Sequence, residues 1–137
     1  MKILIAEDNA VNRELLRELL EMRGFEVFEA CNGKEALEMI ESVCPDLLVL
    51  DLGMPVLDGF GAIEKIRANP QLAHLPVLAA TAYAMRGDRD QVLKAGFDGY
   101  VSKPINSTAL NQEIDRLMSA PKNRETNASS ADSGSTT

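Results

Sequence analysis

The amino-acid sequence predicts an α/β fold in which a doubly wound, five-stranded parallel β-sheet carries helices on both faces. Short apolar runs alternate five times with longer stretches whose apolar residues recur at helical spacing. The apolar runs are continuous rather than alternating, which is typical of strands buried on both faces of a sheet. Because each pair of parallel strands needs a crossover connection, a helix between successive strands completes the pattern.

The first two strand–helix pairs follow directly from this pattern. Residues 2–6 form a continuous apolar run of strand length, and residues 11–22 carry leucines and other apolar residues at helical spacing. Gly24 then suits the C-terminal cap of that helix. Residues 25–30 are rich in strand formers, and the turn sequence at 32–33 precedes a second helical face.

The remaining three pairs repeat the pattern. The strands are expected at residues 47–50, 76–80 and 98–102. The helices are expected around residues 63–66, over 85–95, and after Asn106, whose side chain suits an N-terminal cap.

Length and charge limit the possible functions. The chain has 137 residues, enough for one domain. Acidic residues outnumber basic ones by 21 to 14, which argues against direct binding of nucleic acid. No apolar run approaches the roughly 20 residues of a membrane span, and the N-terminus is too acidic for a signal peptide, so we expect no membrane contact and a cytoplasmic location.

Domain boundaries and cysteines give further expectations. Residues 1–118 are expected to form the domain, and residues 119–137, rich in Ser, Thr and Asn, a disordered polar tail or linker. Cys31 and Cys44 lack metal-ligand spacing and are expected to be reduced, partly buried thiols. With His74 as the only histidine, a zinc site or a histidine-based triad is not expected.

Polar residues that could bind a metal or take part in catalysis stand at the ends of four predicted strands. Glu7 and Asp8 follow the first strand, Asp51 the third, Thr81 the fourth and Lys103 the fifth. Parallel strands end at the same edge of the sheet, where ligands bind in such folds. We therefore expect these five residues to meet in one pocket.

This grouping favours a magnesium-dependent phosphoryl site. Two carboxylates about 4 Å apart repel each other by on the order of 4 kcal/mol, which a hard divalent cation such as Mg²⁺ relieves. Lys103 and the Thr81 hydroxyl can then contact a phosphoryl group, and Asp51 can accept it covalently. Each residue alone also has an ordinary explanation: a turn, a helix cap or a solvated charge. Their joint placement is what indicates a site.

The motifs resemble those of a known family. The matching segments are 3–9 (Ile-Leu-Ile-Ala-Glu-Asp-Asn), 45–59 with its D-x-x-M-P-x-x-D-G pattern, 76–81 and 100–104. Over residues 1–118 the chain resembles the CheY-like receiver domain of two-component response regulators. It is most similar to DivK-type single-domain regulators and to receivers of hybrid histidine kinases. The resemblance implies a flavodoxin-like (βα)5 fold.

The resemblance also implies roles at the metal and phosphoryl site. Asp51 would take a phosphoryl group from a phosphohistidine on a histidine kinase or histidine phosphotransfer protein. Asp8, Asp51 and the backbone carbonyl of Gly53 would bind Mg²⁺, with Glu7 acting through a water molecule. Thr81 would bond the phosphoryl oxygens.

Further roles concern signalling. Lys103 would pair with the phosphoryl group, and its bond to Pro104 would be cis. Thr81 and Tyr100 would form a switch that remodels a surface for a downstream protein target. Such a domain is not a classical enzyme, although it catalyses its own phosphorylation and slow autodephosphorylation. It would be a monomer or a phosphorylation-dependent dimer.

Three other functions compete with this interpretation. A haloacid-dehalogenase-type phosphatase needs a second acid two residues after its nucleophile, where this chain has Gly53. A degenerate receiver that no longer accepts phosphate is disfavoured by the intact set of strand-end residues. A flavodoxin-like FMN binder is disfavoured by the absence of Trp and the few aromatic residues.

Overall fold

A computed structural model of the chain describes residues 1–54, 56–81 and 86–119, with only the backbone described for 86–89. The strands are β1 (Lys2–Ala6), β2 (Glu26–Ala30), β3 (Leu47–Asp51), β4 (Val77–Thr81) and β5 (Gly99–Ser102). The helices are α1 (Ala10–Glu21), α2 (Gly33–Val43), α3 (Gly59–Ala68), α4 (Arg86–Ala95) and α5 (Ser107–Ser119). Strands and helices alternate, as the sequence predicts.

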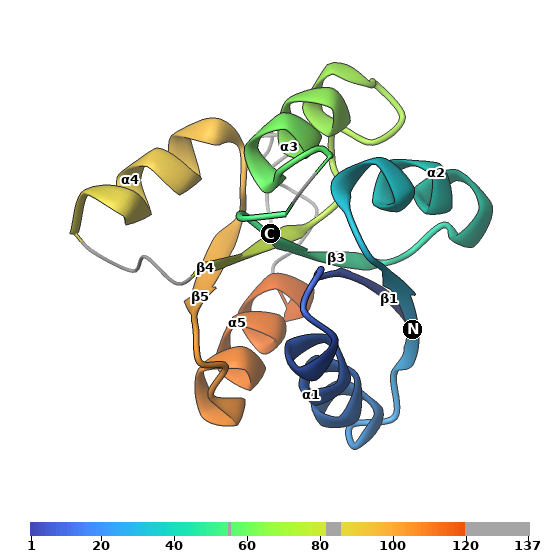
Figure 1. Ribbon diagram of the computed structural model, residues 1–137, viewed down its shortest axis with the longest axis vertical. Helices are drawn as coiled ribbons and strands as arrows, with labels where there is room; N and C mark the ends of the chain where they lie inside the picture. The colour runs from blue at the N-terminus through green and yellow to red at the C-terminus, as the bar shows by residue number, and fades with distance from the viewer. Residues whose placement is uncertain (55, 82–85, 120–137) are drawn as a thin grey trace, which may run out of the picture.

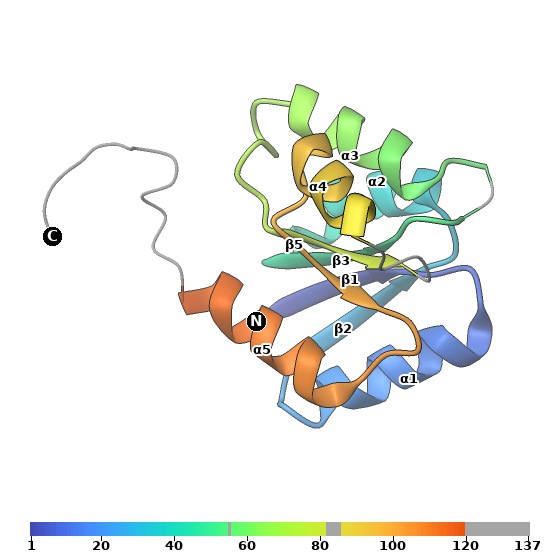
Figure 2. The same ribbon diagram turned by 90° about the vertical axis from the view of Figure 1, so that its left-hand side faces the viewer.

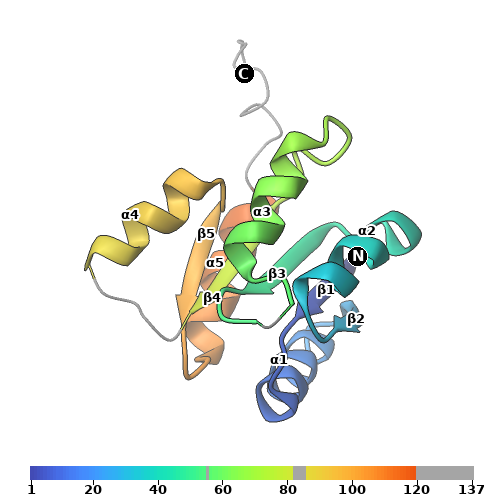
Figure 3. The ribbon, with the colours of Figure 1, turned by 45° about the horizontal axis from the view of Figure 1, so that its top comes forward.

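All five strands form one parallel sheet in the order β2-β1-β3-β4-β5 (Figures 1 and 3). The predicted doubly wound α/β fold is therefore confirmed. The chain moves outward in one direction from β1 to β2 and then in the other direction from β3 to β5. The carboxyl ends of β1 and β3 flank the point of reversal, where such sheets leave a crevice for ligands.

Helices cover both faces of the sheet. Figure 2 shows α1 and α5 on one face and α2, α3 and α4 on the other, and Figure 3 shows α3 between α2 and α4. Successive strand residues serve opposite faces: Ile3 and Ile5 pack in the cluster with α1 and α5, whereas Leu4 and Ala6 pack in the cluster with the other three helices. Each fully buried Leu or Ile contributes about 1.5–3 kcal/mol.

Capping residues stand at the ends of the helices, among them the predicted Gly24 and Asn106. Asn9, Asn32 and Asp58 are N-caps whose side chains each accept a backbone N–H from the first turn of α1, α2 and α3. The side chain of Asn106 does the same for α5. Gly24, predicted to cap α1, has a φ of +86°, which its missing Cβ permits.

Strand boundaries differ slightly from the prediction. β2 begins at Glu26 rather than 25, and β4 runs over Val77–Thr81 rather than 76–80. Thr81 belongs to the strand because its carbonyl accepts the N–H of Lys103, 2.7 Å away, which extends the pairing with β5 by one residue.

The cysteine prediction is wrong in one respect. Cys31 and Cys44 are free thiols, but both are exposed rather than partly buried. Both lie just outside regular elements, Cys31 after β2 and Cys44 at the C-cap of α2, and there the sheet does not cover them.

The expected tail lies outside the described residues from position 120 onward, as does Met85 at the expected start of the fourth helix. Ser119, expected to begin the tail, is the last residue of α5. Within the described ranges, none of the helices is long and apolar enough to cross a membrane.

Candidate phosphoryl and metal site

The predicted strand-end residues meet in one cleft at the carboxyl edge of the sheet. Glu7 and Asp8 follow β1, Asp51 ends β3, Thr81 ends β4, and Lys103 follows β5. All five line a cleft of about 550 Å³, together with Gly53. The structure thus brings together every residue that the sequence places at the metal and phosphoryl site.

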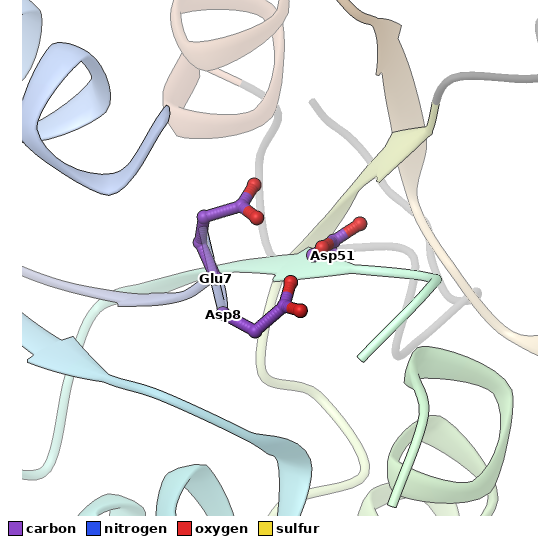
Figure 4. Close-up of side chains that lie close together, drawn as sticks. All are labelled: Glu7, Asp8 and Asp51. Carbon is purple, nitrogen blue, oxygen red and sulfur yellow. The ribbon is translucent and has the colours of Figure 1, made fainter. Parts of the chain in front are cut away.

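Three carboxylates gather in this cleft. One oxygen from each of Glu7, Asp8 and Asp51 lies within 4.8 Å of the other two (Figure 4). Glu7 is 0% and Asp51 4% exposed, whereas Asp8 is exposed. Two of the charges are therefore removed from water, and the third faces the solvent.

Among the described side chains that line the cleft, Lys103 is the cation. Its Nζ lies 2.8 Å from Oε1 of Glu7 and 3.0 Å from Oδ1 of Asp51. Burial alone would lower the pKa of Lys103, but its interactions with the two carboxylates outweigh burial and raise the pKa above its ordinary value. The peptide bond from Lys103 to Pro104 is cis, as the resemblance implies.

Glu7 is the carboxylate most strongly perturbed by this arrangement. Its pKa is raised from 4.5 to about 6, chiefly by burial and in smaller part by the neighbouring Asp51, although Lys103 and the N–H of Asn9 act in the opposite direction. One lysine thus compensates only part of the electrostatic penalty in the cluster. An added cation would be favoured here.

Backbone contacts hold the two buried carboxylates in place. The N–H of Asn9 donates to Oε2 of Glu7 at 3.1 Å, and the N–H of Gly53 donates to Oδ1 of Asp51 at 3.2 Å. Behind Asp51, Gly59 packs so closely that a Cβ there would lie 2.7 Å from the Asp51 carbonyl oxygen. The glycine of the D-G pair therefore permits α3 to begin directly against β3.

Tyr100 does not line the acidic cleft. It lies on β5, half-buried against the apolar cluster that contains Val92 of α4. It lines a separate hollow of about 470 Å³ shared with α5.

A larger hollow of about 930 Å³ lies at the opposite, amino-terminal edge of the sheet. Cys44, Asp46 and His74 are among its lining residues. In the part of the chain that the structure describes, the only group of three metal-ligating side chains is the one in the acidic cleft. The candidate functional site is therefore identified by the chemistry of its side chains and not by the volume of the cleft.

Sequence reasoning missed some features of the cleft. Asn12 and Phe60 also line it, from α1 and α3. Arg13, which the sequence analysis did not single out, reaches back from α1 and donates to the carbonyl oxygen of Glu7 at 2.9 Å. A basic residue near a helix N-terminus interacts unfavourably with the helix dipole. The presence of Arg13 in the first turn of α1 was therefore a signal in the sequence that this side chain has a specific partner.

Comparison with known proteins defines the class. The family model of the response regulator receiver domain matches residues 3–115. The polar-differentiation response regulator DivK of Brucella anthropi is 38% identical over 104 residues, which cover 76% of this chain and 85% of DivK. The hybrid signal transduction histidine kinase I of Dictyostelium discoideum is 41% identical over 121 residues, 82% of this chain but only 7% of that kinase.

A solved structure gives the same result. The receiver domain of sensor histidine kinase PA1611 from Pseudomonas aeruginosa, with a magnesium ion coordinated in its active site cleft, superposes with a TM-score of 0.80 at 34% identity. The match covers 87% of this chain and 98% of that one.

The chain belongs to the response regulator receiver domain family of two-component signal transduction. It has the flavodoxin-like fold of CheY-like receivers, as the resemblance predicted. Receiver domains of this family are signalling domains, and they bind Mg²⁺ in an acidic cleft such as the one formed here.

Proposed function

We propose that this domain accepts a phosphoryl group on Asp51 from a phosphohistidine and thereby switches a protein-interaction surface. The observation that carries the proposal is the position of Lys103, whose Nζ bridges Glu7 and Asp51 within a cleft of three carboxylates. A carboxylate that only caps a turn needs neither a buried second acid nor a lysine shared between them.

The residues of the cleft fit a magnesium ion. They offer hard oxygen ligands, which Mg²⁺ prefers, and burial raises the pKa of Glu7, a cost of ionisation that a nearby cation would reduce. We infer that Asp8, Asp51 and the carbonyl of Gly53 bind the ion directly and that Glu7 acts through a water molecule. The bound ion would supply positive charge that neutralises the carboxylates and the phosphoryl oxygens.

Asp51 performs the covalent step in this proposal. A carboxylate oxygen of Asp51 attacks the phosphorus, the P–N bond to the donor histidine breaks, and the imidazole nitrogen keeps the electron pair of that bond. Burial of Asp51 leaves it few competing contacts with water. Lys103 and Thr81 then contact the phosphoryl oxygens, Lys103 as a positive charge and Thr81 as a hydroxyl donor.

The signalling consequences follow from the positions of Thr81 and Tyr100. A shift of Thr81 towards the phosphoryl group would free space for Tyr100 to turn inward and remodel the face made by α4, β5 and α5. The partners would be a histidine kinase or histidine phosphotransfer protein and a downstream protein target. We infer that the receiver ends with α5 at Ser119 and acts in the cytoplasm, that the residues after it serve as tail or linker, and that the domain is a monomer or dimerises on phosphorylation.

The test is intact-mass spectrometry after incubation with acetyl phosphate and Mg²⁺. We expect wild type to gain about 80 Da, the mass of one phosphoryl group, and Asp51→Asn to gain nothing. Asp46→Asn is the matched control, because Asp46 is an exposed aspartate near the other end of β3. A folded wild-type protein that gains no mass would instead support the degenerate receiver.

A further inference from the structure

Arg13 links helix α1 to the loop that carries the acidic residues. It is the fourth residue of α1, and its Nη1 donates to the backbone carbonyl of Glu7 at 2.9 Å. Its Nε donates to Oε1 of Glu29 at 3.2 Å. The Arg13 side chain is 20% exposed, so both contacts are largely shielded from water.

Glu29 holds the Arg13 guanidinium in its orientation. It lies on β2, paired with Ile5 of β1, so its backbone is part of the sheet. Its second carboxylate oxygen accepts from Arg17, one helical turn further along α1. Arg17 also pairs with Glu21 and does not reach the acidic loop. Two arginines thus share one glutamate, but only Arg13 contacts Glu7.

The Arg13 contact completes the anchoring of the Glu7 backbone. The N–H of Glu7 donates to the carbonyl of Ala30 at 3.1 Å, and its carbonyl accepts from Arg13. Both polar groups are therefore committed, and rotation of the peptide between Glu7 and Asp8 would break a charge-assisted hydrogen bond. The orientation of this peptide determines the direction in which the Asp8 side chain extends from the backbone.

Few other contacts orient the Asp8 side chain. In the described ranges, the structure gives its carboxylate no hydrogen bond or ion pair, and the residue is exposed. Its approach to within 4.8 Å of the other carboxylates is then determined mainly by the backbone. Among the described contacts, the one from Arg13 holds the carbonyl of the peptide that directly precedes Asp8.

We propose that Arg13 is a positioning residue of the magnesium site, acting through the Glu7 carbonyl to aim the Asp8 carboxylate into the cleft. The inference rests on the proposed function, since it assumes that Asp8 is a ligand of Mg²⁺. It assigns Arg13 a geometric effect rather than an electrostatic one. Outer contacts that orient metal ligands typically change metal affinity by about 10–100-fold when removed.

The test is the affinity of the full chain for Mg²⁺, measured by isothermal titration calorimetry at pH 7.5. We expect Arg13→Met to bind Mg²⁺ about 10–100-fold more weakly than wild type. Arg17→Met is the matched control, because Arg17 also pairs with Glu29 yet does not touch the acidic loop, and we expect its affinity to stay within about twofold of wild type. Arg13→Lys keeps the charge but loses the forked geometry, so we expect an intermediate loss.

A second measurement separates positioning from a merely structural role. The initial rate of mass gain with acetyl phosphate, followed against Mg²⁺ concentration, should show a raised half-saturation for Arg13→Met, with the maximal rate within about threefold of wild type. A variant that is only less stable would keep the wild-type half-saturation at a temperature where it is folded.

The outcomes are distinguishable. Equal Mg²⁺ affinity of Arg13→Met and wild type would overturn the inference, as would full rescue by Arg13→Lys, which would make charge alone the cause. A wild type that binds no Mg²⁺ would overturn the proposed function instead. If Arg13→Met does not fold, Glu29→Gln serves in its place, because it weakens the orientation of Arg13 and should also weaken Mg²⁺ binding. Unchanged affinity in that variant would count against the inference.

Discussion

Replacing Glu7 with glutamine should stabilise the metal-free protein at neutral pH. Glu7 is 0% exposed, and burial raises its pKa from 4.5 to about 6. One pKa unit corresponds to about 1.36 kcal/mol, so the ionised carboxylate lowers the free energy of unfolding by about 2 kcal/mol. Glutamine has a similar shape and carries no charge, and it removes this penalty.

The pH dependence follows from the sign of the shift. Between pH 4.5 and about 6 the folded state binds more protons at Glu7 than the unfolded state does, so stability falls as pH rises through this window. The stability associated with Glu7 is fully present below pH 4.5 and lost above about 6. The unfolding free energy of Glu7→Gln should not show this fall between pH 4.5 and about 6.

The assay is urea unfolding in the presence of a chelator, from about pH 4 to pH 8. The quantity of interest is the unfolding free energy of Glu7→Gln minus that of wild type, which should rise by about 2 kcal/mol across the window. Glu38→Gln, at an exposed glutamate of α2, is the matched control. A flat difference for Glu7→Gln would refute the argument that burial perturbs this carboxylate.

Three further predictions concern stability. Asp51→Asn should raise the unfolding free energy in chelator by about 1 kcal/mol, because it reduces repulsion with Glu7, and should respond less to Mg²⁺ in thermal melts; a response equal to that of wild type would contradict metal binding at Asp51. Arg67→Met should lower the urea-derived free energy by about 3–5 kcal/mol, because Arg67 donates to four backbone carbonyls and pairs with Asp98, and a loss below 1 kcal/mol would be inconsistent with that network. Val56→Asn should raise the melting temperature, with a gain of about 1 kcal/mol, because Val56 is exposed at a φ of +70° that suits Asn better; an unchanged or lower melting temperature would contradict strain there.

Most of the fold could be predicted because its signals are local. The apolar runs and helical spacings lie within short windows, and they placed the five strands to within about one residue of the structure. Capping residues such as Asn9 and Asn106 act on the turn that directly follows them. The exposure of Cys31 was not predictable in the same way, because it depends on which elements cover the end of β2.

The gathering of Asp8, Asp51 and Lys103 at one edge is a consequence of the sequence alone. Each stands at or just after the end of a strand, and parallel strands end on the same side. Only the tertiary structure decided that Lys103 bridges Glu7 and Asp51 and that Glu7 is buried deeply enough to raise its pKa. The hydrogen bond from Arg13 to the Glu7 carbonyl is likewise a result of the tertiary structure. These features depend on the exclusion of water and on contacts between side chains of different elements, which no pattern within one segment encodes.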